Sequence, residues 1–194
     1  MIAVIDYNAG NIQSVEFALE RLGADYITTN DKETIRQADK VIFPGVGEAK
    51  NTMEFLKAQG LDVFIKTLKQ PVLGVCLGMQ LMCRHSEEGD VEALGIFDAD
   101  VKLFKPTNGE KVPHMGWNTI SDLKGPLFSK ELEGRYVYFV HSFYAAICDD
   151  TIATTNYILP YSSALHKDNF YATQFHPEKS GDVGELILHN FINL

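Results

Sequence analysis

The sequence lacks the features that mark membrane-spanning, nucleic-acid-binding and disulfide-stabilised proteins. No apolar run in its 194 residues approaches the length of a membrane span. Its 17 Lys and Arg residues are outnumbered by 26 Asp and Glu, the formal net charge is −9, and no basic cluster offsets it locally. We therefore expect no nucleic-acid-binding surface. Three cysteines, an odd number in a chain of this size, do not make a disulfide framework.

Targeting, metal-binding and nucleotide-binding motifs are missing as well. The chain leads directly into the apolar segment Ile2–Ile5 without a basic region or a cleavage site, so we expect a cytoplasmic protein. No group of side chains has metal-ligand spacing, and neither G-x-G-x-x-G nor a P-loop occurs. We expect neither a metal nor an organic cofactor.

What the sequence does contain is centred on residues 71–80. A short apolar run, typical of a buried strand, leads to Cys76, and a Leu- and Met-rich stretch predicts a helix over residues 77–86. Gly74 and Gly78 flank the cysteine, and G-x-nucleophile-x-G at a strand-to-helix corner is a nucleophile elbow. This pattern predicts that Cys76 is a nucleophile. The alternative is that Cys76 is a small buried hydrophobic residue, as many free cysteines are.

A second stretch, residues 172–181, supplies the groups that a thiol nucleophile needs. A weak nucleophile requires an adjacent base, and the base requires a third group that fixes its tautomer and orientation. His176 and Glu178 stand two residues apart after a predicted strand, with Pro177 between them to stiffen the backbone. Alone, this segment could be an ordinary turn. Together with Cys76 it predicts a Cys-His-Glu catalytic triad.

Residues 74–80 and 174–180 resemble the two active-site motifs of the class I glutamine amidotransferases. Further segments are similar to the pattern of the glutaminase subunits of imidazole glycerol phosphate synthases: residues 6–11 with Ser14 and Val15, residues 44–47, residues 113–118 and residues 138–143. The resemblance covers essentially the whole chain, in motif order.

The resemblance implies hydrolysis of the glutamine side-chain amide through a thioester on Cys76. His176 would protonate the leaving ammonia and then activate water, while Glu178 orients the imidazole. The Leu77 N–H would be one oxyanion donor. The resemblance implies a second donor from residues 44–47, namely Val46 N–H after a peptide rotation that the two glycines around it, Gly45 and Gly47, make easy. Otherwise this loop is a strand-ending turn.

Substrate binding is expected from residues near the nucleophile. Gln80 lies one helical turn after Cys76, so its amide can reach the pocket. The resemblance adds Gly45, His141, Ser142 and Phe143, at places where the family binds glutamine. A helix-surface amide at Gln80 and a core histidine at His141 are the alternatives.

The resemblance also implies a partner, the (β/α)8-barrel cyclase subunit of the synthase. The two proteins would form a heterodimer in histidine biosynthesis, in which ammonia passes to the cyclase and imidazole glycerol phosphate and an aminoimidazole carboxamide ribotide are formed. Aromatic residues are enriched at protein contacts, although among short strands they more often belong to the core. The candidate interface residues are Gly10, Asn11, Trp117, Tyr136, Tyr138 and Lys179.

The order of strand and helix patterns predicts an α/β fold with a single domain over residues 1–194. Strands at 2–6, 25–28, 41–43 and 72–75 alternate with helices at 12–22, 30–38, 49–59 and 61–69. This rhythm predicts a doubly wound, mostly parallel central sheet with helices on both faces, as in class I glutamine amidotransferases. The second half is β-rich, with strands at 101–104, 117–120, 136–143, 151–156 and 170–175 and a closing helix at 183–192.

Three other interpretations remain open. A paralogous glutaminase could deliver ammonia to a different synthase, for example in surface-sugar amidation, because Asn8 replaces the usual Gly and residues 97–99 depart from the family pattern. A non-catalytic binding module could use the same scaffold. A cysteine peptidase on a similar sheet would need a wider cleft. Glutamate release from glutamine, with and without the cyclase, separates these possibilities.

Overall fold

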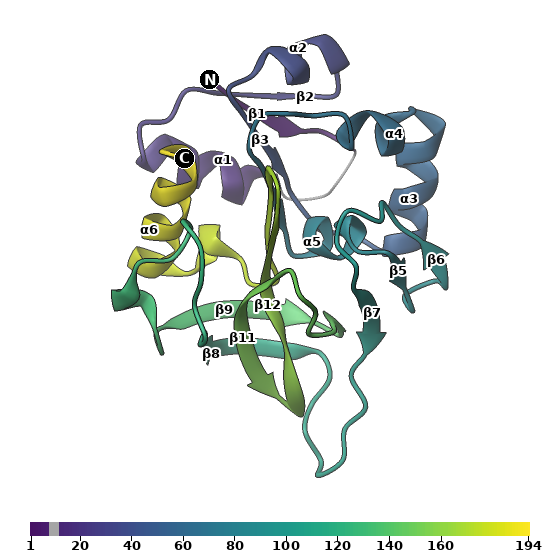
Figure 1. Ribbon diagram of the computed structural model, residues 1–194, viewed down its shortest axis with the longest axis vertical. Coiled ribbons are helices and arrows are strands. Elements are labelled where there is room, and N and C mark those ends of the chain that lie inside the picture. Colours follow the sequence, from purple (N-terminus) through teal and green to yellow (C-terminus); the bar gives the residue numbers. More distant parts are fainter. Residues whose placement is uncertain (8–11) are drawn as a thin grey trace.

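A mixed sheet runs through the centre of the molecule and carries helices on both faces (Figure 1). The structure is a computed structural model that describes residues 1–7 and 12–194. Two predicted interface residues, Gly10 and Asn11, lie outside the described residues, as does Asn8.

The described residues form the following elements. The helices are α1 (Gln13–Arg21), α2 (Lys32–Gln37), α3 (Ala49–Ala58), α4 (Leu61–Ile65), α5 (Leu77–Met82) and α6 (Gly181–Ile192), with 3-10 turns at Lys130–Leu132 and Pro177–Lys179. The strands are β1 (Ile2–Ile5), β2 (Tyr26–Thr29), β3 (Lys40–Phe43), β4 (Val72–Val75), β5 (His85–Ser86), β6 (Val91–Glu92), β7 (Asp100–Leu103), β8 (His114–Thr119), β9 (Tyr136–His141), β10 (Phe143–Ala145), β11 (Thr151–Tyr157), β12 (Leu159–Lys167) and β13 (Phe170–Thr173).

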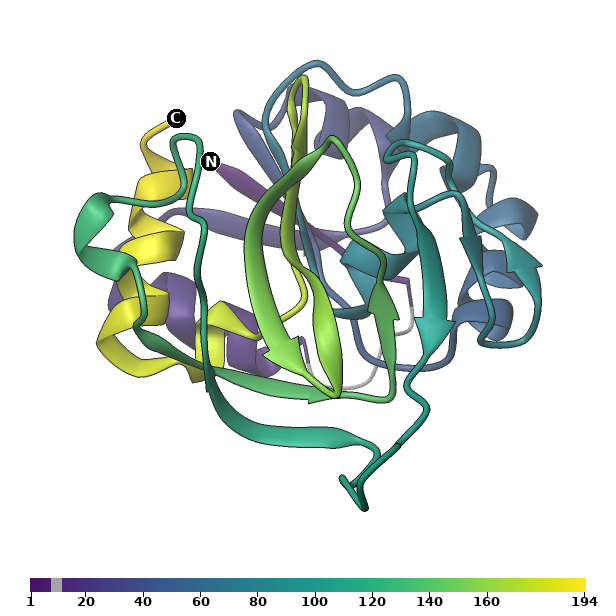
Figure 2. The same ribbon diagram turned by 60° about the horizontal axis from the view of Figure 1, so that its bottom comes forward.

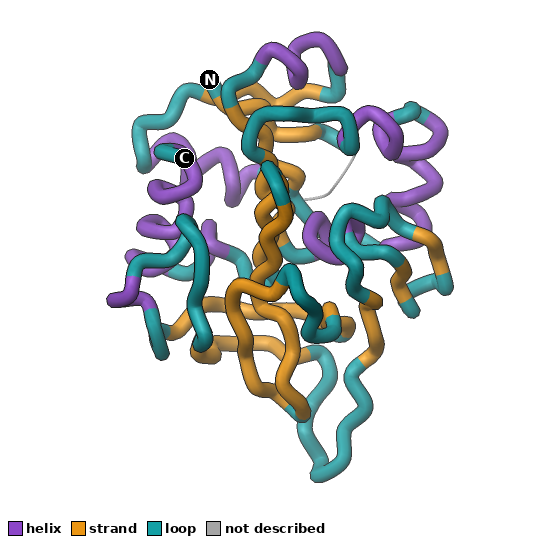
Figure 3. The backbone as a smooth tube through the Cα atoms, in the orientation of Figure 1, coloured by secondary structure: helices purple, strands orange, loops and turns teal. Residues whose placement is uncertain are grey.

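The main sheet has a parallel half and a mixed half. Strands β2, β1, β3, β4 and β13 are neighbours in that order and run parallel. The sheet continues through β12, β10, β7, β5 and β6, and β11 pairs with β12. Figure 3 shows the parallel strands between the helices, and the long antiparallel strands extending beyond them. The predicted α/β class with a mostly parallel central sheet is confirmed. Most strands of the β-rich second half extend this sheet through antiparallel pairs, except that β5 and β7 are parallel.

Helix packing divides the apolar core into two layers. Helices α1 and α6 cover one face through Val15, Leu19, Ile187 and Phe191, and helices α2 to α5 cover the other (Figure 1). All residues of β1, β4 and β13 are buried, as strands covered on both faces require. The rigid parallel strands therefore hold the loops at their ends in fixed positions.

Strands β8 and β9 form a separate two-stranded sheet, which lies across the ends of β11 and β12 (Figures 1 and 2). Trp117 pairs with Tyr138 in this hairpin. One face of this sheet is packed against the core, where alternate residues of β9, including Val137 and Phe139, are buried. On the opposite face Met115, Trp117 and Tyr136 are exposed. We call this second face the outer face of β8–β9.

Several predicted boundaries are wrong. The helix expected over 77–86 ends at Met82, because the following residues join the sheet as β5, where Arg84 N–H donates to Ala99 O. The helix expected over 61–69 ends at Ile65. Asp31, rather than Asn30, caps α2, since its carboxylate accepts the Thr34 N–H. The sequence analysis missed β12 entirely.

No helix in the part of the chain that the structure describes combines the length and apolar character needed to cross a bilayer.

Candidate active site

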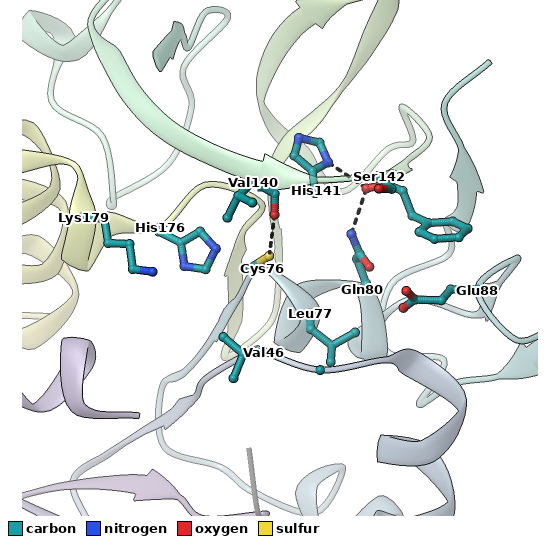
Figure 4. Close-up of a pocket in the computed structure, with 13 residues that line it drawn as sticks. Val46, Cys76, Leu77, Gln80, Glu88, Val140, His141, Ser142, His176 and Lys179 are labelled. Atoms are coloured by element: carbon teal, nitrogen blue, oxygen red, sulfur yellow. Dashed lines mark hydrogen bonds between the residues drawn. The ribbon is translucent and has the colours of Figure 1, made fainter. Parts of the chain in front are cut away.

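Four segments that follow parallel strands meet at one edge of the sheet. Tyr7 comes after β1, the 44–47 loop after β3, Cys76 after β4, and residues 174–176 after β13. Because these strands are parallel neighbours, their carboxyl ends lie together. A pocket of about 240 Å³ opens there (Figure 4). It is lined by Gly45, Val46, Gly47, Cys76, Leu77, Gln80, Glu88, Val140, His141, Ser142, Phe143, His176 and Lys179.

Cys76 has the strained backbone of a nucleophile elbow. Its φ of 51° and ψ of −105° lie in a region that residues with a side chain rarely adopt. The surrounding structure holds this geometry, since Cys76 N–H donates to Thr173 O at 2.7 Å and Gln80 N–H donates to Cys76 O at 3.2 Å. The strand therefore turns sharply into α5 and presents the thiol to the pocket.

Glycines allow the 44–47 loop to lie directly against this turn. A Cβ on Gly45 would come within 2.2 Å of Val75 O and 2.4 Å of Leu77 N. A Cβ on Gly78 would come within 2.2 Å of Phe43 O. Only backbone fits between the two segments at both positions. This contact places Val46 beside Cys76, as Figure 4 shows.

The Cys76 sulfur has one acceptor and one donor among its neighbours. The residue is 8% exposed. Its Sγ donates weakly to the Val140 carbonyl at 3.9 Å and accepts from Gln174 Nε2 at 3.6 Å. Cys83 and Cys148, in contrast, lie outside this pocket.

His176 and Glu178 form a buried hydrogen-bonded pair beside the thiol. Nδ1 of His176 lies 2.7 Å from Oε1 of Glu178, and their side chains are 4% and 5% exposed. The backbone of Tyr138 anchors this turn at two points. Its carbonyl accepts His176 N–H at 2.9 Å, and its N–H donates to the Ser180 hydroxyl at 3.0 Å. Ser180 in turn donates to His176 O.

The pKa of His176 is strongly raised. Burial lowers it, but the interactions with Cys76 and Glu178 together outweigh burial and raise the pKa to about 10. Nε2, the nitrogen not engaged by Glu178, has no hydrogen-bond partner of ordinary geometry among the described residues. The imidazole is therefore charged at neutral pH and keeps one N–H available for a reacting group.

The predicted oxyanion donors are not both directed into the pocket. The Tyr7 hydroxyl donates to Pro44 O at 2.5 Å, and the Val46 N–H interacts with the same phenolic oxygen, which acts to lower the pKa of Tyr7. Burial raises the pKa of Tyr7, so the hydroxyl stays protonated. Gly47 has a φ of +124°, which only glycine adopts without strain. The oxyanion roles of Val46, Gly47 and Leu77 remain predictions.

Gln80 lies at the pocket wall with both amide hydrogens engaged. Its Nε2 donates to Phe143 O and to Gln174 Oε1, both at 2.9 Å. The sequence analysis missed Glu88, which lines the pocket on the same side (Figure 4). Burial raises the pKa of Glu88, while Ala49 N–H, which it accepts at 2.9 Å, acts in the opposite direction. The position of Glu88 in this pocket depends on segments far apart in the sequence, so the sequence alone did not predict it.

The side chain of His141 points away from Cys76, into the core (Figure 4). Its Nδ1 donates to Phe143 O at 2.7 Å, and its Nε2 lies 3.2 Å from Nδ1 of His114. Burial lowers the pKa of His141 to about 3 and that of His114 to about 4, so both rings are neutral at pH 7. His141 lines the pocket, but its side chain is that of a core histidine, the alternative given above. Its role toward substrate remains a prediction.

Predicted interface residues cluster on the outer face of β8–β9. Trp117 and Tyr136 are 55% and 60% exposed. The Trp117 and Tyr138 rings meet edge to face with centroids 5.9 Å apart. Lys179 lies at the rim of the pocket. This face joins the pocket through β9, whose Val140 and His141 line it.

Residues 1–7 and 12–194 contain no group of three or more His, Cys, Asp or Glu side chains placed to hold a metal ion.

Comparisons with known proteins agree on one family. The sequence matches Glutamine amidotransferase class-I over residues 3–194. It is 64% identical over 194 residues to imidazole glycerol phosphate synthase subunit HisH of Bacteroides thetaiotaomicron, covering 100% of this chain and 99% of the relative. The protein of the same name from Colwellia psychrerythraea is 44% identical, with 98% and 92% covered. The crystal structure of a glutamine amidotransferase from Thermotoga maritima shares the fold, with a TM-score of 0.65 at 16% identity over 99% of this chain and 82% of that one.

Proposed function

Because this chain belongs to the class I glutamine amidotransferases, we propose that its Cys76, His176 and Glu178 hydrolyse glutamine to glutamate and ammonia. The chain is the glutamine-hydrolysing subunit of an imidazole glycerol phosphate synthase, an enzyme of histidine biosynthesis. One observation carries the assignment of the triad. The strained Cys76 and His176, whose Nδ1 is paired with the buried Glu178, line one pocket although 100 residues separate the cysteine from the histidine.

The proposed reaction uses each member in turn. The Cys76 thiolate attacks the side-chain amide carbon of glutamine, with the thiol proton held by His176. The tetrahedral intermediate collapses to a thioester as His176 gives its proton to the departing ammonia. His176 then takes a proton from water, which attacks the thioester and releases glutamate. Glu178 orients the imidazole and stabilises its charged form throughout.

The 44–47 loop is proposed to switch the oxyanion site. In the observed orientation, the Val46 N–H is bound to Tyr7, so only Leu77 N–H, which has no intrahelical acceptor at the start of α5, is available. Rotation of the Gly45–Val46 peptide would supply the second donor. Gly47 on the far side of Val46 eases that rotation. A partner that favours the rotated state would thereby couple hydrolysis to its own occupancy.

Glutamine is proposed to lie along the wall opposite His176. Glu88 supplies a carboxylate for the α-ammonium group, and Gln80 Oε1 is a neutral acceptor beside it. Gly45 and Ser142 contribute backbone polar groups, and Phe143 contributes apolar surface. The site is closed to water on the sheet side, where the core begins.

We propose that the (β/α)8-barrel cyclase docks on the outer face of β8–β9 and receives the ammonia. Exposed Trp117 and Tyr136 beside the pocket support this, because large aromatic side chains anchor protein interfaces. The heterodimer, the single domain over residues 1–194 and a cytoplasmic location belong to the same proposal.

The test is glutamate production from glutamine, with and without the cyclase and its ribulosyl-nucleotide substrate. Cys76→Ala is the inactive variant, and Cys148→Ala, outside the pocket, is the matched control. We expect stimulated activity in the wild type and in Cys148→Ala but none in Cys76→Ala. Activity that ignores this partner would assign the chain to another ammonia acceptor, and no activity under any condition would leave a binding module.

A further inference from the structure

A chain of amide hydrogen bonds leads from β10 to the Cys76 sulfur. Gln80 Nε2 donates to Phe143 O at 2.9 Å and to Gln174 Oε1 at 2.9 Å. Gln174 Nε2 then lies 3.6 Å from Cys76 Sγ. Gln174 is 0% exposed and Gln80 is 4% exposed, so water does not compete for these bonds. The mechanism derived above makes no use of Gln174.

The carbonyl of Phe143 fixes the direction of this chain. Both amide hydrogens of Gln80 are used, one on Phe143 O and one on Gln174 Oε1. A flipped Gln80 amide would set its oxygen 2.9 Å from the Phe143 carbonyl oxygen, which already accepts from His141 Nδ1, so two buried acceptors would face each other with no hydrogen between them. Since the oxygen of Gln174 must therefore face Gln80, its NH2 group must face the sulfur.

We propose that Gln174 is a hydrogen-bond donor to the nucleophile, held in place by Gln80, and that it stabilises the Cys76 thiolate relative to the thiol. The proposal rests on the assignment of Cys76 as nucleophile.

The two neighbours of the sulfur act on different protonation states. The thiol can donate to Val140 O at 3.9 Å, whereas a thiolate has no hydrogen to give and meets only the negative end of that carbonyl. The Gln174 N–H bond strengthens when the sulfur carries a charge. Gln174 thus offsets the effect of Val140 O when the proton passes from Sγ to His176.

The experiment measures alkylation of Cys76 by iodoacetamide against pH, with each modified cysteine mapped by mass spectrometry. Gln174→Glu keeps the size and the acceptor for Gln80 but places a carboxylate instead of a donor at the sulfur. Gln174→Leu removes both functions. Because hydrogen bonds to charged groups are the stronger ones, we expect alkylation at pH 7 to slow roughly 10-fold or more in both variants, with the largest loss in Gln174→Glu.

Two controls separate this role from a structural one. Ser163→Ala removes a buried hydroxyl on β12 that has no hydrogen-bond partner among residues 1–7 and 12–194. The backbone carbonyl of Ser163, which accepts Gln174 N–H, is kept in this variant. The variant should leave Cys76 alkylation unchanged. The partly buried Cys148 is an internal standard whose rate should stay constant in every variant.

Folded Gln174→Glu and Gln174→Leu proteins that alkylate Cys76 within twofold of the wild-type rate would overturn the proposal. If Gln174→Leu does not fold, the isosteric Gln174→Glu decides. Alkylation does not depend on glutamine turnover. A protein without glutaminase activity whose Cys76 still responds to Gln174 would therefore contradict the proposed function and leave this inference standing.

Discussion

The hydroxyl of Tyr7 lies 2.5 Å from the carbonyl oxygen of Pro44 and donates a hydrogen bond to it. The phenolic oxygen of Tyr7 also interacts with the Val46 N–H. One buried side chain, packed edge to face on Phe43 with ring centroids 5.3 Å apart, thus fixes both ends of the Gly45 segment. The orientation of the 44–47 loop is stabilised from β1, the neighbouring strand.

Tyr7→Phe should raise glutaminase activity measured without a partner. The ring would keep its contact with Phe43, but the loop would lose the hydrogen bond at Pro44 O and the interaction of Val46 N–H with the hydroxyl, so its rotated state would become more populated. A buried hydrogen bond contributes about 1 kcal/mol, which predicts a roughly three- to tenfold rise and a smaller stimulation by the cyclase. Tyr157→Phe, which loses a bond to Lys111 O away from the site, is the control. Basal activity equal to or below that of the wild type would contradict this prediction.

Cys76→Ala should lower the pKa of His176. Burial lowers this pKa, and the two Cys76 interactions are the largest of those that raise it to about 10. Titration of the imidazole followed by NMR measures the change. The prediction fails if the imidazole of the variant still titrates near pH 10.

The same shift predicts how stability depends on pH. The folded-state pKa of His176 is raised above the unfolded value of 6.5, so its contribution to stability is fully present below pH 6.5 and is lost as pH rises through about 10. The stability difference between wild type and Cys76→Ala, from urea unfolding, should therefore shrink between pH 6.5 and 10. A stability difference that grows between pH 6.5 and 10 would contradict this prediction.

Glu178→Gln should reduce kcat by about 10³- to 10⁴-fold while the chain stays folded. The amide keeps the shape of the carboxylate but neither stabilises the imidazolium nor enforces its tautomer. Glu185→Gln, at an exposed carboxylate paired with Arg21, is the matched change and should leave kcat near wild type. Equal kcat values in the two variants would remove Glu178 from the mechanism.

Gly45→Ala should destabilise the fold by at least ~3 kcal/mol. The new Cβ would lie 2.2 Å from Val75 O and 2.3 Å from Gly78 N, which are backbone atoms that cannot turn aside. Gly134→Ala has open space around it and a φ of +73°, so it isolates the cost of left-handed backbone at about 1–2 kcal/mol. Chemical denaturation compares the two. A smaller loss at position 45 than at 134 would mean that the loop readily shifts.

Trp117→Ala should weaken cyclase binding by about 10-fold or more, without changing partner-free glutaminase activity. The side chain is exposed on the outer face of β8–β9, and its removal leaves the pocket intact. The control is Phe17→Ala, which truncates an aromatic side chain of similar exposure, 53%, on α1, away from the proposed interface. Calorimetric titration of both variants checks the interface, and equal affinities would place it elsewhere.

Local sequence was sufficient to predict the backbone geometry around Cys76. The G-x-Cys-x-G corner has a fixed relation between backbone and side chain, so its strain and its position at a strand end followed from spacing alone. The same holds for residues 41–47, where an apolar strand stops at Pro44. Parallel strands then brought Cys76 and His176 together by topology, and the fold class was predictable from the alternation of strands and helices.

Contacts between distant segments were not predictable in this way. The nine-residue strand β12 escaped detection because Pro160 and the Ser162–Ser163 pair interrupt the apolar pattern, yet the strand is buried between β11, β13 and β10. The helix after Cys76 ends early because His85 and Ser86 pair with β7 as strand β5. The side chain of His141 points into the core, where its Nε2 contacts a second histidine, His114. The positions of Glu88 and Gln174 relative to the thiol likewise depend on neighbours far away in sequence.

The hydrogen bonds that Tyr138 makes to residues 176 and 180 have an evolutionary consequence. Strand β9 presents alternate side chains to the exterior, and its backbone to the turn that carries His176, the proposed catalytic base. The exterior side chains can therefore be exchanged, and the chain adapted to a new synthase, while the backbone bonds that position His176 remain. Lineages that changed acceptors on this scaffold should show divergence on the outer positions of β8 and β9 and constancy in the turn behind them.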